Sequence, residues 1–294
     1  MKPLSDQALA RLRRAASLPD LSSTRYTLVR EAGHGGMGTV YVVRDEELGR
    51  EVALKVFHIE DEQMRREAQA LAKLEHPNIV PLYEFGRLDD GRHYYTMKLV
   101  EGARLDEYRA GPATQADRLR LFVSICGAAS FAHSRGVLHR DLKPRNIMVG
   151  SFGEVLVMDW GLAKPLNEAT PTGQVAGTPE YMAPEQARGD PSLDERADVY
   201  ALGRILAFLC DDPPPKPLRS VSAKACADRR DARYAKASEL AADVLRYLDG
   251  LPVLAHRETP LEAATRWYRN NRTLLLLIAS YAVMRFLIFF WARA

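Results

Sequence analysis

The sequence predicts an α+β fold with two lobes, a small β-rich lobe followed by a larger helical lobe, and one transmembrane helix near the C-terminal end. Three observations predict it. Strand-like runs fill much of the first hundred residues, and apolar residues then recur at helical spacing. An apolar run of 18 residues with a single charge, Leu274 to Trp291, lies near the end of the chain.

Composition excludes several classes of protein. The chain has 294 residues, of which 47% are hydrophobic and 27% charged, enough to bury one large core or two smaller lobes and unlike a disordered chain. A net charge of +3 gives no indication of a nucleic-acid partner. Cys126, Cys210 and Cys226 are odd in number and lack metal-ligand spacing, so we expect reduced thiols in a cytoplasmic domain.

The small lobe is expected at 26–100, after an N-terminal extension of residues 1–25. "TVYVV" and "EVALKVF" are β-rich, and the turn-like "DEELG" separates them. "HPNIVPLYEFG" and "HYYTMKLV" predict two more strands, and Glu62 to Leu74 has helical spacing. The lobe is therefore predicted to be a small sheet with one helix.

The large lobe is expected at 101–250, because three apolar stripes at helical spacing follow one another. The stripes are Leu119, Phe122, Val123, Cys126 and His133, then Val199, Leu202, Ile205, Leu206 and Leu209, then Leu240, Val244, Leu245 and Leu248. Between the second and third stripes, "DDPPPKP" (Asp211–Pro217) predicts a loop.

Residues 273–292 are predicted to form the transmembrane helix, after a juxtamembrane linker at 251–272. A bilayer core needs about 17–25 helical residues, and about eleven Leu, Ile, Val and Phe side chains outweigh the single Arg285. A helix buried against the globular part, or in a homodimer, is the alternative.

Flanking charge predicts the orientation of this helix. Arg266, Arg269 and Arg272 precede the apolar run, and only Arg293 follows it. Because positive residues stay on the cytoplasmic side, we expect a single-pass protein of the inner membrane with the bulk of the chain in the cytoplasm.

A glycine-rich loop between two of the predicted strands fits the pattern G-x-G-x-x-G-x-V. It comprises Gly33, His34, Gly35, Gly36, Met37, Gly38, Thr39 and Val40. Glycines let backbone amides approach phosphate oxygens, and a following strand argues against the dinucleotide fingerprint, in which a helix follows. Lys55 in "VALK" can neutralise two phosphates, and Glu67 in "RREAQAL" is the acid expected to hold it.

A second cluster, "LHRDLKPRN", runs from Leu138 to Asn146, and Asp159 in "VMDWGLAK" follows thirteen residues later. With the glycine-rich loop, Lys55 and Glu67, these motifs stand in the order typical of protein kinases. From about Tyr26 to Gly250 the chain resembles the bacterial relatives of eukaryotic serine/threonine protein kinases. The resemblance implies that ATP and Mg²⁺ bind in a cleft between the lobes.

The resemblance also implies a role for each motif residue. Asp141 would accept or orient the proton of the substrate hydroxyl, and Lys143 would contact the transferred phosphate. Asn146 and Asp159 would bind magnesium, which prefers oxygen ligands. The residues that would surround the adenine are Val40, Ala53, Met97, Leu99 and Met148.

Further residues resemble the pattern of serine/threonine kinases rather than that of tyrosine kinases. Such a kinase would phosphorylate hydroxyl groups of proteins. Lys143 follows Asp141 by two positions, and Thr178 in "GTPEYMAPE" is placed to bridge them. Glu185 is expected to pair with Arg233. Asp198 is expected to be buried beneath the catalytic loop, where its charge needs partners. The Glu185–Arg233 pair would lock the "GTPEYMAPE" segment onto the helical lobe.

An activation loop is expected between Lys164 and Thr178. Its candidate phosphorylation sites are Thr170, Thr172 and Thr178. Arg140 could receive a phosphate there through charge-assisted hydrogen bonds. The alternative is that these threonines are ordinary loop residues.

Three features depart from the family pattern. Trp160 replaces the usual Phe after the metal-binding aspartate, and we expect it to pack in a spine with Leu71, Leu82 and His139, where its N–H needs a partner. Lys98 stands where relatives commonly carry an acid. The segment between Leu209 and Arg233 is short, which predicts the loss of a helix that helps to dock protein substrates.

The sequence therefore predicts a membrane-anchored, ATP-dependent serine/threonine protein kinase that autophosphorylates and acts in bacterial signalling. A pseudokinase scaffold that binds nucleotide or partners is the first alternative, and the short segment after Leu209 favours it. A kinase of small molecules is the second, and "HRDLKPRN" and "APE" argue against it.

Overall fold

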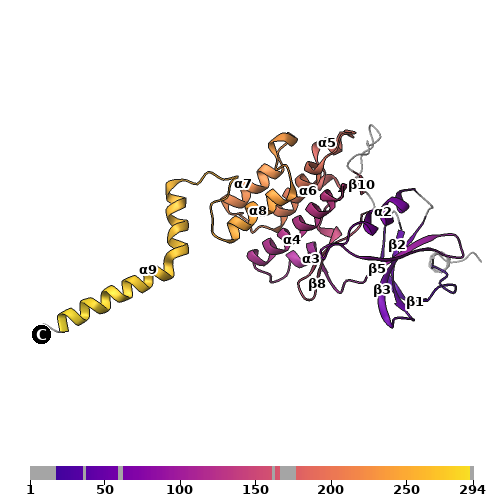
Figure 1. Cartoon of the computed structure of the whole chain (residues 1–294), viewed down its shortest axis with the longest axis horizontal. Coiled ribbons are helices and arrows are strands. Elements are labelled where there is room, and N and C mark those ends of the chain that lie inside the picture. The colour runs from indigo at the N-terminus through magenta and orange to yellow at the C-terminus, as the bar shows by residue number, and fades with distance from the viewer. Residues whose placement is uncertain (1–17, 36–37, 59–61, 161–162, 166–176, 292–294) are drawn as a thin grey trace, which may run out of the picture.

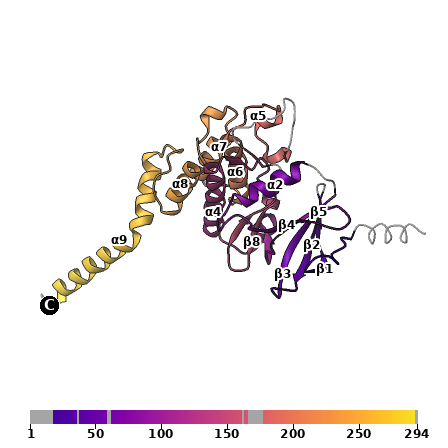
Figure 2. The ribbon, with the colours of Figure 1, turned by 45° about the vertical axis from the view of Figure 1, so that its right-hand side comes forward.

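The structure is a computed structural model that describes residues 18–35, 38–58, 62–160, 163–165 and 177–291. Within these ranges it has a β-rich lobe, a helical lobe, and a long helix that leads away from the helical lobe (Figures 1 and 2). The predicted fold class is confirmed.

The β-rich lobe is a five-stranded antiparallel sheet with strand order β1-β2-β3-β5-β4, accompanied by one helix, α2. Its elements are β1 (Tyr26–His34), β2 (Gly38–Asp45), β3 (Arg50–Phe57), α2 (Glu62–Ala72), β4 (Leu82–Arg87) and β5 (His93–Lys98). The alternation of side chains along β2 and β3 gives the sheet two apolar faces. One face forms a separate small core with Tyr41, Leu54 and Val56, and the other contributes Ala53 and Met97 to the main core.

The helical lobe begins with short elements and continues with helices that pack around α4. The elements are β6 (Gly102–Arg104), α3 (Leu105–Arg109), α4 (Gln115–Ser134), β7 (Val137–Leu138), η1 (Pro144–Asn146), β8 (Ile147–Gly150), β9 (Val155–Val157), β10 (Lys164–Pro165), η2 (Pro179–Tyr181), α5 (Pro184–Ala187), α6 (Glu195–Leu209), α7 (Lys216–Ala225), η3 (Arg230–Ala232) and α8 (Ala237–Leu248). Thr114 and Asp117 form a capping box that fixes the start of α4. The predicted stripes of α4, α6 and α8 supply the core between them, except that Leu245 is 42% exposed and His133 contacts Asp198.

The two lobes share one apolar core, which fixes their relative position. The connection between α2 and β4 hydrogen-bonds to β9, since the Val157 amide donates to the Asn78 carbonyl at 2.9 Å and the Val80 amide donates to Val157 at 3.2 Å. Because Asp159 follows β9 by two residues, this contact brings the start of "DWG" under the helix that carries Glu67.

The segment between Leu209 and Arg233 contains one helix, α7, which was not predicted from the sequence, while the loss of the substrate-docking helix of relatives stays a prediction. The prolines misled the prediction: Pro215 is the N-cap of α7 and Pro217 stands in its first turn, where a proline needs no backbone N–H and its φ is already helical. Leu218, Val221 and Ala225 then bury one face of α7 against the core.

The last helix, α9 (Pro260–Trp291), runs from the expected linker through the expected membrane segment. It is long and apolar enough to cross a membrane, and none of that span is buried within the chain. Burial against the globular part, one alternative from the sequence, is therefore wrong. Both views show α9 changing direction part-way along (Figures 1 and 2).

Candidate active site

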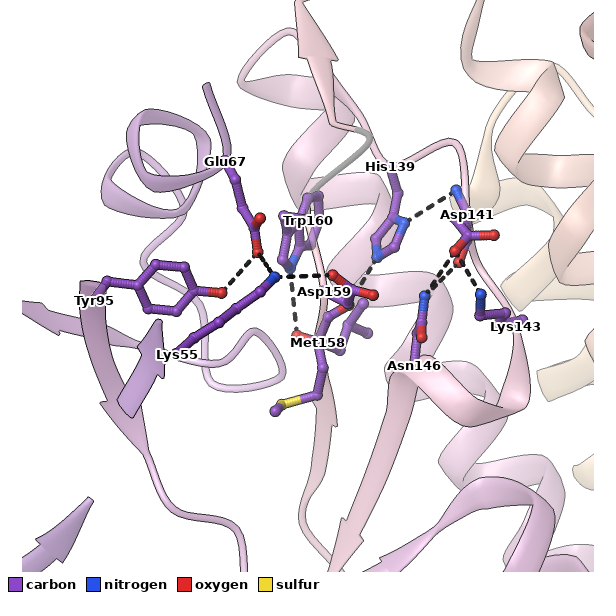
Figure 3. A network of polar contacts seen from close by, with 11 residues as sticks. Lys55, Glu67, Tyr95, His139, Asp141, Lys143, Asn146, Met158, Asp159 and Trp160 are labelled. Atoms are coloured by element: carbon purple, nitrogen blue, oxygen red, sulfur yellow. Dashed lines mark hydrogen bonds and ion pairs between the residues drawn. The ribbon is translucent and has the colours of Figure 1, made fainter. Parts of the chain in front are cut away.

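Lys55 and Glu67 meet at the junction of the sheet and α2. The Lys55 Nζ donates to the Glu67 Oε1 at 2.7 Å, and the Tyr95 hydroxyl donates to the same oxygen at 2.7 Å (Figure 3). Lys55 lies opposite Tyr95 in the β3–β5 register, which explains why both side chains reach one acid. The predicted Lys55–Glu67 pair is confirmed, and it is buried.

Asp159 links this pair to the helical lobe. Its Oδ1 lies 3.4 Å from the Lys55 Nζ, while the carboxylate is 45% exposed and can meet a ligand. Burial opposes the charge on Lys55, but Glu67 and Asp159 outweigh it and raise the lysine pKa. Burial likewise opposes ionisation of Asp159, and the charge of Lys55 outweighs it and lowers the aspartate pKa. Both groups are therefore held in their charged forms.

The backbone of Asp159 is left-handed, with φ of +57°. A non-glycine residue rarely adopts this conformation, and such strain is commonly found at functional sites. The turn aims the carboxylate toward Lys55, as Figure 3 shows.

The glycine-rich loop connects β1 and β2. Gly35 and Gly38 exchange backbone hydrogen bonds of 2.9 and 3.3 Å, and a Cβ on Gly38 would lie 2.4 Å from the Val56 carbonyl oxygen. Gly38 is therefore required by the close approach of β3. The His34 Nδ1 lies 2.8 Å from the Thr39 hydroxyl, which ties the two sides of the loop. Gly36 and Met37 lie outside the described residues.

The catalytic-loop residues form a compact polar cluster in the helical lobe. The Lys143 Nζ donates to the Asp141 Oδ2 at 2.7 Å and to the Thr178 hydroxyl at 2.8 Å, and that hydroxyl donates to the Asp141 Oδ1 at 2.8 Å. The predicted bridge by Thr178 is confirmed. Asn146 donates from Nδ2 to the Asp141 carbonyl and carboxylate, at 2.9 and 3.2 Å.

Asn146 and Asp159 supply oxygen ligands suited to magnesium. Because the Asn146 Nδ2 is engaged with Asp141, the amide oxygen is left for a cation. The Met158 amide donates to the Asn146 carbonyl at 2.8 Å, which holds together the segments that carry Asn146 and Asp159. A carboxylate kept ionised and one amide oxygen fit Mg²⁺, whose remaining ligands are usually waters and phosphate oxygens.

Asp198 supports the catalytic loop from below. Its carboxylate is 1% exposed and accepts from the amides of His139 and Arg140, both at 2.9 Å, while the His133 Nε2 lies 2.8 Å away. Burial opposes its ionisation, but the His133 hydrogen bond and nearby positive charge lower its pKa. These bonds hold Arg140 at a φ of +68°, and the predicted support by Asp198 is confirmed.

Trp160 fits its pocket. The indole is 1% exposed and its ring centroid lies 4.5 Å from that of His139. Its Nε1 donates to the Val157 carbonyl at 3.4 Å, so the N–H has the partner that the sequence required. The His139 Nε2 in turn lies 3.1 Å from the Met158 carbonyl. The larger ring is accommodated beside the Asp159 turn.

The remaining predicted contacts lie around this centre. Glu185 and Arg233 form a buried, bidentate pair at 2.7 and 2.8 Å, as expected. Lys98 forms a solvent-accessible ion pair of 3.6 Å with Glu154. The residues expected around the adenine that belong to the apolar core or pack against it are Val40, Ala53, Met97 and Leu99. Met148 lies on β8 and is partly exposed.

Sequence reasoning missed two residues that hydrogen-bond to the acids of the site, Tyr95 and His133. Tyr95 read only as a strand residue, since nothing local indicates that its hydroxyl meets Glu67 from another element. His133 read as a member of the apolar stripe of α4, although a histidine on a buried face could have signalled a polar partner. Thr170 and Thr172 lie outside the described residues.

Comparison with known proteins agrees with the resemblance seen in the sequence. The family model of the protein kinase domain matches residues 26–248. Serine/threonine-protein kinase PknB of Mycobacterium leprae is 36% identical over 278 residues, covering 80% of this chain and 44% of that protein. PknB of Mycobacterium tuberculosis (strain H37Rv) is 36% identical over 279 residues, with the same coverage. A probable PknB of Bifidobacterium longum is 34% identical over 293 residues, covering 82% and 42%. The chain thus spans less than half the length of these relatives.

Proposed function

Because the chain belongs to the protein kinase family, we propose that it transfers the γ-phosphate of ATP to serine or threonine hydroxyls of proteins. One observation carries the proposal. Lys55 contacts Glu67 of its own lobe and Asp159 of the helical lobe, and in the helical lobe Asn146 hydrogen-bonds to Asp141. This is the arrangement that phosphoryl transfer needs, since it depends on positioning and on charge cancellation.

Each residue then has one task. Lys55 holds the nucleotide phosphates and Glu67 holds Lys55, while the amides of the glycine-rich loop cover the phosphates. Asp141 orients the attacking hydroxyl and accepts its proton. Lys143 offers positive charge beside that hydroxyl, and Thr178 keeps the two side chains in register. Asn146 and Asp159 hold Mg²⁺, which neutralises charge on the phosphate oxygens when it is bound.

The substrate is proposed to be a protein because the segment that follows the active site is rigidly attached. The buried Glu185–Arg233 pair anchors α5, and the Arg204 guanidinium donates to the Glu180 carbonyl at 3.0 Å. A fixed platform beside Asp141 and Thr178 suits an extended polypeptide.

Autophosphorylation at Thr170 or Thr172 is part of the proposal. The Nε and Nη2 atoms of Arg140 are buried and make no hydrogen bond with any residue that the structure describes. Burial lowers the pKa of this guanidinium, while Asp198 counteracts the effect. A phosphate would supply the acceptors that these buried N–H groups lack, because it accepts several charge-assisted hydrogen bonds. The tests are phosphosite mapping by mass spectrometry and the double variant Thr170→Ala, Thr172→Ala, which should lose activity.

Membrane anchoring by α9 is also proposed, with the lobes on the cytoplasmic side of the inner membrane. The length and apolar exposure of α9 support it, as do the three arginines that precede the apolar run. A homodimer through α9 remains compatible with this arrangement.

The decisive experiment is a radiolabelled phosphotransfer assay with the purified full chain, ATP and Mg²⁺, on itself and on a general protein substrate. Asp141→Asn is the test variant, and Asp231→Asn, which changes an exposed acid of η3, is the matched control. We expect Asp141→Asn to lose at least about two orders of magnitude in rate, in the range of general acid–base contributions. Equal transfer by wild type and Asp141→Asn would instead indicate a scaffold.

A further inference from the structure

A pocket separates the helical lobe from the first turns of α9. It has a volume of about 340 Å³, within the size range of ligand sites. Its floor comes from the end of α8 and the chain that follows, one wall from the start of α7 and the other from α9. The side chains that matter below are Lys216, Tyr247, Leu251, Leu261, Arg266 and Arg269. In Figure 1 this region lies where α9 approaches α7 and α8.

Polar contacts fix the walls of this pocket. The Asn270 amide donates to the Gly250 carbonyl at 2.9 Å, just after α8 ends. Arg266 forms a bidentate pair with Glu258 at 2.7 and 2.9 Å, and the Lys216 Nζ contacts the Glu262 Oε1 at 2.9 Å. The beginning of α9 is therefore docked on the helical lobe by contacts from three separate segments.

The charge inside the pocket is unevenly satisfied. Three basic side chains and His256 face two acids, and each acid already has partners: Glu258 pairs with Arg266, and Glu262 contacts Lys216 and His256. Arg269 lines the same pocket and makes no ion pair or hydrogen bond with any residue that the structure describes. One positive charge is thus left at the mouth, beside apolar side chains.

The position of Arg269 relative to the apolar run places it at headgroup depth. It precedes residue 273 by four positions, about 6 Å along a helix axis, and each headgroup layer is about 5–8 Å thick. Trp267 and Tyr268 are 57% and 60% exposed on the adjacent faces, where aromatic rings commonly occupy a membrane interface.

We propose that this pocket binds the phosphate of an anionic phospholipid headgroup, with Arg269 as the principal contact. The phosphate lies against Arg269, while Lys216 and Arg266 stay paired with Glu262 and Glu258. The part of the headgroup beyond the phosphate lies against Tyr247, Leu251 and Leu261, and the acyl chains run from the phosphate along the apolar part of α9. The assignment rests on the proposed membrane anchor.

A lipid is the favoured source of the phosphate because the pocket adjoins apolar surface that continues into the membrane segment. A soluble phosphate ester would have no use for that surface. An anionic lipid also gains from the local excess of positive charge, by about 1 kcal/mol per basic residue near the surface. The lobes would then be held at a fixed orientation, with α7 and α8 facing the bilayer.

The test is native mass spectrometry of the full chain in neutral detergent micelles supplied with equal amounts of phosphatidylglycerol and phosphatidylcholine. We expect the wild type to retain phosphatidylglycerol preferentially and Arg269→Gln to lower the retained fraction about fivefold, which corresponds to about 1 kcal/mol. Arg272→Gln is the matched control. It removes the same charge from the same helix, one turn closer to the apolar run, but does not line the pocket.

The outcomes separate the alternatives. Equal losses in Arg269→Gln and Arg272→Gln, or no preference in the wild type, would overturn the pocket assignment in favour of diffuse attraction. Displacement of the lipid by equimolar inorganic phosphate would overturn the lipid as the source. Extraction of the chain from vesicles by alkaline carbonate would refute the anchor, whereas specific retention in micelles would still support the pocket.

Discussion

The interlobe cleft buries charge, whereas the second half of α9 exposes apolar surface. In the cleft and beneath it, Lys55, Glu67 and Asp198 are at most 7% exposed, and each has a charged or hydrogen-bonding partner within the chain. Along α9, Leu276 and Leu277 are more than 60% exposed. Buried charge and exposed apolar surface both raise the free energy of a protein in water, but the chain itself supplies partners only for the buried charges. The helix requires other surroundings, and a bilayer supplies them.

The largest effect is expected at Asp198. Replacing it by alanine leaves two buried amides and His133 without their acceptor, which should lower the free energy of unfolding by about 3–5 kcal/mol. The measurement is the urea midpoint of the two-lobed part in the full chain. Asp90→Ala is the control, because Asp90 pairs with Arg92 at the surface and its loss should matter by less than about 1 kcal/mol. Similar midpoints for the two variants would contradict the difference drawn between buried and exposed charge.

The next effect concerns α9. Val283→Arg adds a second charge near the middle of the apolar run, and a central arginine disfavours insertion by about 2.5–3.5 kcal/mol. We expect the variant to be extracted from membranes by alkaline carbonate while the wild type and Val283→Leu stay in the pellet. If Val283→Arg pelleted as the wild type does, α9 would be exposed for some reason other than a bilayer.

The main residues of the cleft and the exposed apolar helix could both be predicted from the sequence, for different reasons. Lys55, Glu67, Asp141, Asn146 and Asp159 stand in short motifs whose order carries the long-range information, so their convergence could be expected before any coordinates. The α9 span was predictable because bilayer insertion depends on length and composition alone.

The parts that sequence reasoning missed depend on contacts between distant elements. The hydroxyl of Tyr95 reaches Glu67 only because β3 and β5 pair in one register. The helix α7 was hidden because prolines read as breakers unless the position of the first turn is known. From the sequence, Arg269 served only as one of the arginines that orient the transmembrane helix. The pocket that it lines forms only because α9 docks on Gly250.

A smaller effect is expected at Trp160, whose buried ring packs against His139 and directly follows Asp159 in the chain. Trp160→Phe leaves a void next to His139 and should lower stability by about 1–2 kcal/mol, since large-to-small changes in a core lose both contacts and cavity filling. Phosphotransfer should stay within an order of magnitude, because the Asp159 carboxylate is untouched. The measurements are thermal unfolding and the radiolabel assay. A more stable variant would show that the indole is overpacked.

The smallest effect is a shift in the titration of Asp159. In the folded chain its pKa is below the ordinary value, since Lys55 outweighs the opposing burial. Ionised Asp159 therefore contributes to stability above the unfolded pKa of about 3.9, and the contribution is lost as the pH falls through the folded pKa. Lys55→Met removes the compensating charge, so we expect the pKa to rise, measured from the carbon-13 shift of the labelled carboxyl. Lys98→Met, whose partner is Glu154, should leave it unchanged. An unshifted Asp159 in Lys55→Met would mean that the two lobes are not coupled through this pair.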